Sequence, residues 1–205
     1  MQFTDQHNEI RRTVSQFVEK EINPFVEEWE NAGIFPAHEV FKKAGNLGLL
    51  GIHKPEEYGG LGLDYSYALV AQEEWGSASH GSVPLSIAVQ TDMATPALAR
   101  FGSDELKRNF LTPAIAGDMV TSIGVSEPHA GSDVAAIKTT AIKRGDDYVI
   151  NGTKMWITNS TQADYICLLA NTSDDQKHVN KSLIIVPTDV PGFSTSNIHH
   201  PWLCK

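Results

Sequence analysis

The chain has 205 residues, of which 41% are hydrophobic, so it is long enough and apolar enough to bury the cores of one large or two small domains. Its 25 acidic residues outnumber its 16 Lys and Arg, and with no basic patch to offset the net charge of -9 it is not expected to bind nucleic acid. No apolar stretch approaches the roughly 20 residues that cross a bilayer, so no membrane span is predicted.

Helices are predicted throughout residues 1–118. Between Ile10 and Trp29 the apolar residues recur at steps of three and four, which places them on one stripe of a helix, and Pro24 is expected to kink or restart it. A second helix is expected over residues 36–47. Further helices are expected after the capping residues Asp64 and Ser103, and over residues 83–101 ahead of Gly102.

After Gly117 the chain changes to alternating and β-branched runs, which predict an antiparallel sheet. Asn151-Gly152 is the strongest hairpin signal, because that dipeptide tolerates the positive φ angles of a type I′ turn. Further turns are expected at 144–147 and 172–180. The predicted strands are residues 119–125, 137–143, 148–150, 155–158, 165–170 and 183–186.

Two segments of this second half have chemistry suited to a flat, polar-edged cofactor. Residues 125–133 leave a strand and enter a loop, where backbone N–H groups and the hydroxyls of Ser126 and Ser132 suit a flavin edge or a pyrophosphate. A plain turn between two strands explains the same residues. In the predicted strand at 155–158, Trp156 can pack against an isoalloxazine ring and Thr158 can hydrogen-bond its polar edge, although a strand tryptophan is usually core.

Other common chemistries leave no signature. The sequence has no G-x-G-x-x-G after a strand, no P-loop, no G-x-S-x-G and no H-E-x-x-H. Its eight histidines include no i, i+4 pair on a helix, and no metal site is predicted. Cys167 and Cys204 lack the paired spacing of a zinc site, and so few cysteines favour a reducing compartment.

The two segments together resemble the signature of the acyl-CoA dehydrogenases in order, spacing and residue type. The matching runs are V-S-E-P-x-A-G-S-D-V from residue 125, I-K-T-T-A from residue 137 and N-G-T-K-M-W-I-T-N from residue 151. The runs K-P-E-E-Y-G-G from residue 54 and R-F-G-S from residue 100 resemble the N-terminal domain of that family. The resemblance covers residues 1 to about 198, with His129 standing where the family usually has glycine.

This resemblance implies an α+β fold in two domains. Residues 1–118 would form an all-helical N-terminal domain, and residues 119–205 a middle antiparallel β-barrel domain that is incomplete at its C-terminal end. After Ile198 the family continues with a K-x-G-x-R-type segment, whereas this chain reads H-H-P-W-L-C-K. The family's C-terminal helical domain, which carries the catalytic glutamate, is expected to lie outside these residues, so no catalytic residue is assigned here.

The resemblance also implies FAD as the cofactor and assigns the residues that contact it. Thr158 would hydrogen-bond the flavin near its hydride-accepting nitrogen, Trp156 would pack beside the ring, and Ser132 would contact the acyl-CoA substrate as well. The implied FAD-binding residues are Ile123, Gly124, Val125, Ser126, Gly131, Ser132, Trp156, Ile157 and Thr158.

The family reaction oxidises an acyl-CoA thioester to a trans-2-enoyl-CoA, in fatty-acid or branched-chain amino-acid breakdown. The complete enzyme would pass electrons to electron-transfer flavoprotein and form a homodimer or homotetramer, in the mitochondrial matrix of a eukaryote or the cytoplasm of a bacterium. The 205 residues alone are expected to be inactive. Two alternatives stay open: a truncated, non-catalytic product that binds flavin weakly or pairs with full-length subunits, and an acyl-CoA oxidase.

Overall fold

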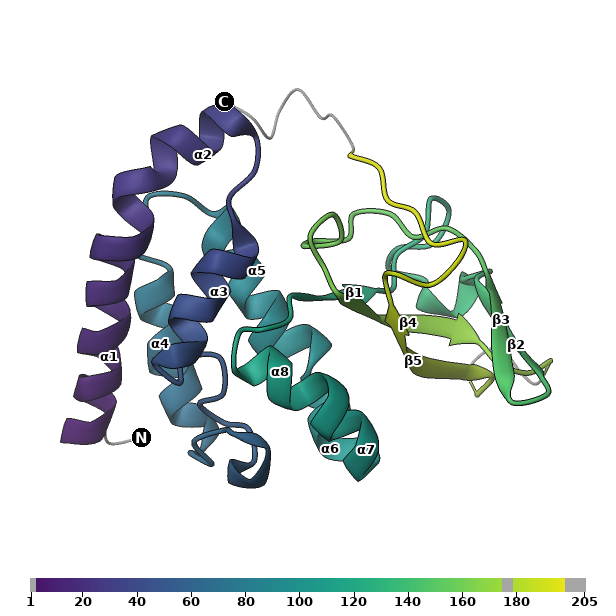
Figure 1. Ribbon diagram of the computed structural model, residues 1–205, viewed down its shortest axis with the longest axis horizontal. Helices are drawn as coiled ribbons and strands as arrows, with labels where there is room; N and C mark the ends of the chain where they lie inside the picture. The colour runs from purple at the N-terminus through teal and green to yellow at the C-terminus, as the bar shows by residue number, and fades with distance from the viewer. Residues whose placement is uncertain (1–2, 175–178, 198–205) are drawn as a thin grey trace. The chain divides into compact units, whose positions relative to one another are not determined.

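The computed structural model describes residues 3–174 and 179–197, and the chain divides into two compact units between Val120 and Thr121. The described part of the first unit contains helices, and the strands all lie in the second (Figure 1). The predicted order of a helical half followed by a sheet half is therefore confirmed. Over the described ranges, no helix combines the length and apolar character needed to cross a membrane.

The predicted N-terminal helix is present and is interrupted at the expected place. α1 spans Asp5–Phe17 and passes through a π-helical turn, Val18–Ile22, and a 3-10 turn, Asn23–Phe25, before α2 at Val26–Ala32. Because proline has no backbone N–H, the chain restarts its helix around Pro24. The apolar stripe is buried up to Ile22, whereas Phe25 is 38% exposed.

The two helices that follow Asp64 and Ser103 begin where these capping residues predict. The Asp64 carboxylate accepts the backbone N–H of Ser66 at 2.8 Å, and Ser103 Oγ accepts that of Leu106 at 3.2 Å. These elements are α3 (Ala37–Asn46), a 3-10 turn (Glu56–Tyr58), α4 (Tyr65–Trp75), α5 (Ser82–Ala88), a π-helical turn η4 (Val89–Ala94), α6 (Pro96–Phe101), α7 (Asp104–Leu106), a π-helical turn (Lys107–Leu111) and α8 (Thr112–Ile115).

The core of the helical unit forms where α1 packs along α4 (Figure 1). Phe17 of α1 meets Trp75 of α4 edge to face, with 5.5 Å between ring centroids. At the margin of this contact the Arg11 guanidinium joins Glu73 and Glu74, at 2.5 and 3.1 Å. The apolar stripe predicted on the N-terminal helix is thus the face of α1 that α4 covers.

The second unit contains one mixed sheet, so the prediction of an antiparallel sheet is wrong in part. β2 and β3 pair antiparallel, as do β4 and β5, but β1 runs parallel to β4 and β2 meets the far end of β4 in parallel. Alternation predicts that a strand exists but not which way its partner runs. The described strands do not show a closed barrel. Their bounds are β1 Thr121–Gly124, β2 Thr140–Arg144, β3 Asp147–Asn151, β4 Tyr165–Asn171 and β5 Lys181–Pro187.

Asn151-Gly152 does not form the predicted hairpin turn. β2 and β3 are joined instead through Gly145, at φ 65, inside the turn expected at 144–147. Asn151 is the last residue of β3 and pairs with Thr140. Gly152 lies so close to Thr139 that an added Cβ would fall 2.3 Å from Thr139 Oγ1. Glycine is therefore required at 152 by packing, not by a turn. Residues 198–205, with the divergent end of the chain, lie outside the described residues.

Candidate functional site

The structure brings the two predicted cofactor-binding segments together beyond the end of β1. The backbone N–H of Met155 donates to the carbonyl oxygen of Ser126 at 2.9 Å. The neighbouring Lys154 ammonium donates to the carbonyl oxygen of Val125, also at 2.9 Å. Two segments that are 29 residues apart in sequence are thus held together by consecutive contacts.

The segment 155–158 is not a strand, so that prediction is wrong. Trp156 has φ 63 and Asn159 has φ 69, both in the left-handed region, and turns follow from residue 158. The run alternates as a strand would, but a left-handed residue breaks the period of two, so Trp156 and Thr158 do not share a strand face. A bulky residue in this region costs about 1–3 kcal/mol and persists where its surroundings hold it, often at functional sites.

Of the predicted FAD-binding residues, those at the end of β1 are packed and those in the loop are accessible. Ile123 pairs with Cys167, and Gly124 is buried so tightly that an added Cβ would lie 3.1 Å from Ile166 Cγ2. Val125 and Ser126 are half-buried. The remaining loop residues Gly131 and Ser132 are exposed, Ile157 and Thr158 are half-buried, and Trp156 is 57% exposed.

Glu127 anchors this loop from inside. Only 5% of this residue is exposed. Its carboxylate accepts hydrogen bonds from the backbone N–H groups of Lys138 and Thr139, at 2.7 and 2.9 Å. It also accepts hydrogen bonds from the Thr139 hydroxyl, at 2.5 Å, and from the Lys154 ammonium, at 2.9 Å. Reciprocal backbone hydrogen bonds between Glu127 and Ala130 close the tip of the loop. Burial raises the pKa of Glu127, but these hydrogen bonds outweigh burial and lower the pKa to about 2.

Lys154 is the residue that joins the loop to the second segment, and sequence reasoning assigned it no role. Burial lowers its pKa, and the hydrogen bond and charge of Glu127 oppose that shift only in part. The two side chains nevertheless lie 2.9 Å apart, with the Lys154 side chain 9% exposed and the Glu127 side chain 2% exposed, so we treat them as a buried ion pair. The sequence signal was the lysine inside N-G-T-K-M-W-I-T-N.

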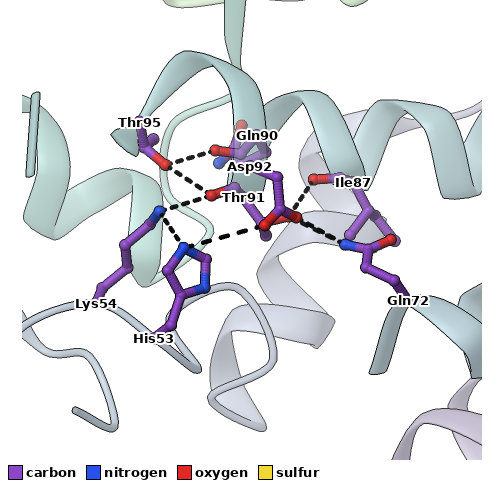
Figure 2. Close-up of polar contacts among 8 residues, drawn as sticks. All are labelled: His53, Lys54, Gln72, Ile87, Gln90, Thr91, Asp92 and Thr95. Atoms are coloured by element: carbon purple, nitrogen blue, oxygen red, sulfur yellow. Dashed lines mark hydrogen bonds and ion pairs between the residues drawn. The ribbon is translucent and has the colours of Figure 1, made fainter. Parts of the chain in front are cut away.

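The helical unit has a separate buried polar cluster, made by the glycine-rich loop before α4 and the π-helical turn η4 (Figure 2). Lys54, 2% exposed, donates to the Thr91 carbonyl oxygen at 2.6 Å and contacts His53 Nε2 at 3.0 Å. Asp92 Oδ1 lies 4.0 Å from the same His53 nitrogen. Because a π-helical turn displaces the regular backbone pairing, this ammonium has a structural use as a donor to a displaced carbonyl.

The arrangement in the sheet unit fits a flavin. Exposed backbone and the hydroxyls of Ser126, Ser132 and Thr158 offer donors and acceptors for a polar edge, and the exposed Trp156 ring offers an apolar face. The loop that carries Ser126 and Ser132 is anchored by the buried Glu127 carboxylate, and Lys154 joins it to the segment that carries Trp156 and Thr158.

Comparison with known proteins shows the family. Residues 4–118 match the profile of the acyl-CoA dehydrogenase N-terminal domain, and residues 122–202 match that of the acyl-CoA dehydrogenase middle domain. The chain therefore belongs to the acyl-CoA dehydrogenase family.

Individual relatives agree. A probable acyl-CoA dehydrogenase of Bacillus subtilis, YngJ, is 44% identical over 198 residues, which are 96% of this chain and 51% of that protein. The crystal structure of an acyl-CoA dehydrogenase from Geobacillus kaustophilus superposes with a TM-score of 0.86 at 38% identity, covering 93% of this chain and 50% of that one. A glutaryl-CoA dehydrogenase from Mycobacterium smegmatis in complex with FADH2 gives 0.87 at 35% identity, covering 96% and 49%. The chain spans about half the length of these relatives.

Proposed function

We propose that the 205 residues provide the helical N-terminal domain and one wall of the FAD site of an acyl-CoA dehydrogenase, which oxidises an acyl-CoA thioester to a trans-2-enoyl-CoA. The observation that supports this most directly is the joining of the loop after β1 to the segment 154–158. Both segments carry the family signature, and they are separated in sequence by the whole β2–β3 hairpin.

The residues of this wall would bind and orient the cofactor and substrate. Backbone groups from Ile123 to Ser132 would hydrogen-bond the polar edge of FAD, Trp156 would pack beside its ring and Thr158 would hydrogen-bond its edge. Ser132, exposed at the far end of the loop, would also contact acyl-CoA. Bound FAD supplies the hydride acceptor. In the complete protein, electron-transfer flavoprotein would receive the electrons and like subunits would associate.

Glu127 is unsuited to remove the substrate proton. A general base needs an accessible lone pair and a pKa near the working pH. Glu127, the buried carboxylate beside the loop, meets neither condition, because four hydrogen bonds occupy it and its pKa is about 2. We therefore propose that the 205-residue protein by itself binds FAD but does not turn over substrate.

Flavin titration of the purified protein, followed by quenching of FAD fluorescence, tests the cofactor assignment. Saturable binding is expected, and its absence at high flavin concentration would overturn the assignment. Dye reduction with added FAD and a panel of acyl-CoAs tests the second part. No turnover above a flavin-only blank is expected; clear turnover from a preparation free of host dehydrogenases would show that these residues include a base.

A further inference from the structure

We infer that Glu127 and Lys154 are positioning residues for the flavin site, which hold the loop after β1 and the strained turn at Trp156 in one fixed relation. The inference rests on the proposed function and adds the two residues that set the geometry of the site. Neither residue was among those expected to contact FAD, and their side chains are only 9% (Lys154) and 2% (Glu127) exposed.

Three polar contacts join the two segments, and they involve five residues. Lys154 Nζ lies 2.9 Å from Val125 O and 2.9 Å from Glu127 Oε1, and Met155 N donates to Ser126 O at 2.9 Å. Residues 125, 126 and 127 are therefore each hydrogen-bonded to residue 154 or 155. Such consecutive contacts fix both the separation and the register of the two segments.

The carboxylate extends this fixed relation to a third segment. Glu127 accepts both backbone N–H groups at Lys138 and Thr139, just before β2, and the Thr139 hydroxyl. Thr139 in turn packs against Gly152, two residues before Lys154, where no side chain fits. Each of the three segments is therefore held by the other two, with the ion pair between Glu127 and Lys154 at the centre.

Packing alone does not explain why this centre is charged. Desolvation makes a buried ion pair a weak source of stability, and apolar side chains of similar volume often replace one without loss. Apolar side chains would, however, leave the Val125 carbonyl without the Lys154 donor and would not select one register. Hydrogen bonds and ion pairs are directional, so they can hold the polar groups of a binding site in the positions that a ligand requires.

The turn beside Lys154 shows what these contacts hold in place. Trp156 lies two residues after Lys154, in the left-handed region at φ 63, and its ring is 57% exposed. A strained residue persists only where its surroundings over-determine it. One such restraint, on the residue before Trp156, is the hydrogen bond from Met155 N to Ser126 O. Loss of Lys154 or Glu127 would let residues 154–156 relax towards extended backbone and would turn the ring away from the loop.

The test compares FAD affinity with folding in variants of the full 205-residue protein. Lys154→Met and Glu127→Gln are expected to weaken FAD binding about tenfold or more at temperatures where circular dichroism shows them folded, and Lys154→Arg should recover most of the affinity. The visible band of bound flavin should shift in Lys154→Met and not in Lys154→Arg. Lys42→Met removes an exposed lysine paired with Asp118 in the helical unit and should change neither affinity nor spectrum.

A double variant, Glu127→Leu with Lys154→Met, covers the case in which the single variants fail to fold. It replaces the ion pair by apolar side chains and should fold while still binding FAD weakly. Parent-like affinity in any folded variant without the charged pair would overturn the inference and leave the proposed function standing. Failure of the parent protein itself to bind FAD would overturn the proposed function, and the inference with it.

Discussion

The Lys54 ammonium nitrogen lies 2.6 Å from the carbonyl oxygen of Thr91, and 2% of Lys54 is exposed. This contact joins the glycine-rich loop before α4 to the π-helical turn η4, 37 residues later. Burial lowers the pKa of Lys54 from 10.5 to about 8, with the charge of Asp92 opposing the shift in part. Among the described residues no carboxylate hydrogen-bonds Lys54, so burying its charge on folding costs free energy.

The first prediction is a rise in stability with pH that depends on Lys54. Between pH 8 and 10.5 the unfolded chain binds more protons at this residue than the folded chain, so the free energy of unfolding increases with pH. The gain should approach about 3 kcal/mol in the parent relative to Lys54→Met. Urea denaturation of both proteins across this pH range measures the gain. The difference between their free energies of unfolding removes the contribution of the other titrating groups.

Lys43→Met is the matched control, because Lys43 is largely exposed and pairs with Glu21 on the surface. It should follow the parent at every pH. Parallel curves for the parent and Lys54→Met would show that Lys54 titrates in the folded protein as it does in the unfolded chain.

Acid should destabilise the sheet unit through Glu127. The folded-state pKa of about 2 lies below the ordinary value of 4.5, so the stabilisation is present above pH 4.5 and is lost as the pH falls towards 2. It amounts to about 3 kcal/mol. The free energy of unfolding, measured by circular dichroism between pH 6 and 3, should show this loss in the parent. The control variant Glu28→Gln, which removes an exposed carboxylate, should show the same loss.

Glu127→Gln should be less stable than the parent at pH 7 by about 3–5 kcal/mol, because Lys154 would stay buried without its carboxylate. Its stability should depend less on pH in the acid range. If Glu127→Gln and the parent lose stability equally on acidification, the titrating group is another carboxylate.

Gly152→Ala should destabilise the protein by about 1–3 kcal/mol. The added Cβ would fall 2.3 Å from Thr139 Oγ1 and 2.7 Å from Thr139 Cα, so the strand entry that donates to Glu127 must move. Gly131→Ala is the matched control from the exposed loop, where an added Cβ meets nothing within 4 Å. Chemical denaturation should separate the two variants; equal stabilities would mean that Thr139 adjusts freely.

Trp156→Ala should separate flavin binding from folding. Because 57% of Trp156 is exposed, its removal should lower the free energy of unfolding by less than the ~3–5 kcal/mol typical of a buried tryptophan. Affinity for FAD should fall because the apolar face of the wall is lost, and Trp156→Phe should restore part of it. Fluorescence titration with FAD measures both variants. Full affinity in a stable Trp156→Ala protein would remove this ring from the proposed site.

Local signals in the sequence predicted several features of the helical half, but not the π-helical turn η4 that divides the helix expected over residues 83–101. Asp64 and Ser103 cap helices through bonds to residues two and three positions away, and Pro24 interrupts a helix by its own lack of an N–H. Such interactions depend on neighbours in sequence, so they can be predicted from it. The resemblance also located both segments of the candidate site, because order and spacing of residue types are properties of the sequence.

Tertiary structure decided the features that depend on distant partners. The parallel pairing of Thr121 with Tyr165 cannot be derived from alternation, which is the same for either strand direction. Gly152 carries a hairpin signal, yet its role is set by Thr139 across the packed interior. Trp156 lies in a run with strand-like alternation but adopts a left-handed conformation beside contacts that start at Lys154. The position of that ammonium between Val125 and Glu127 arises only when segments far apart in sequence are folded against each other, because buried charge is stable only beside its partner.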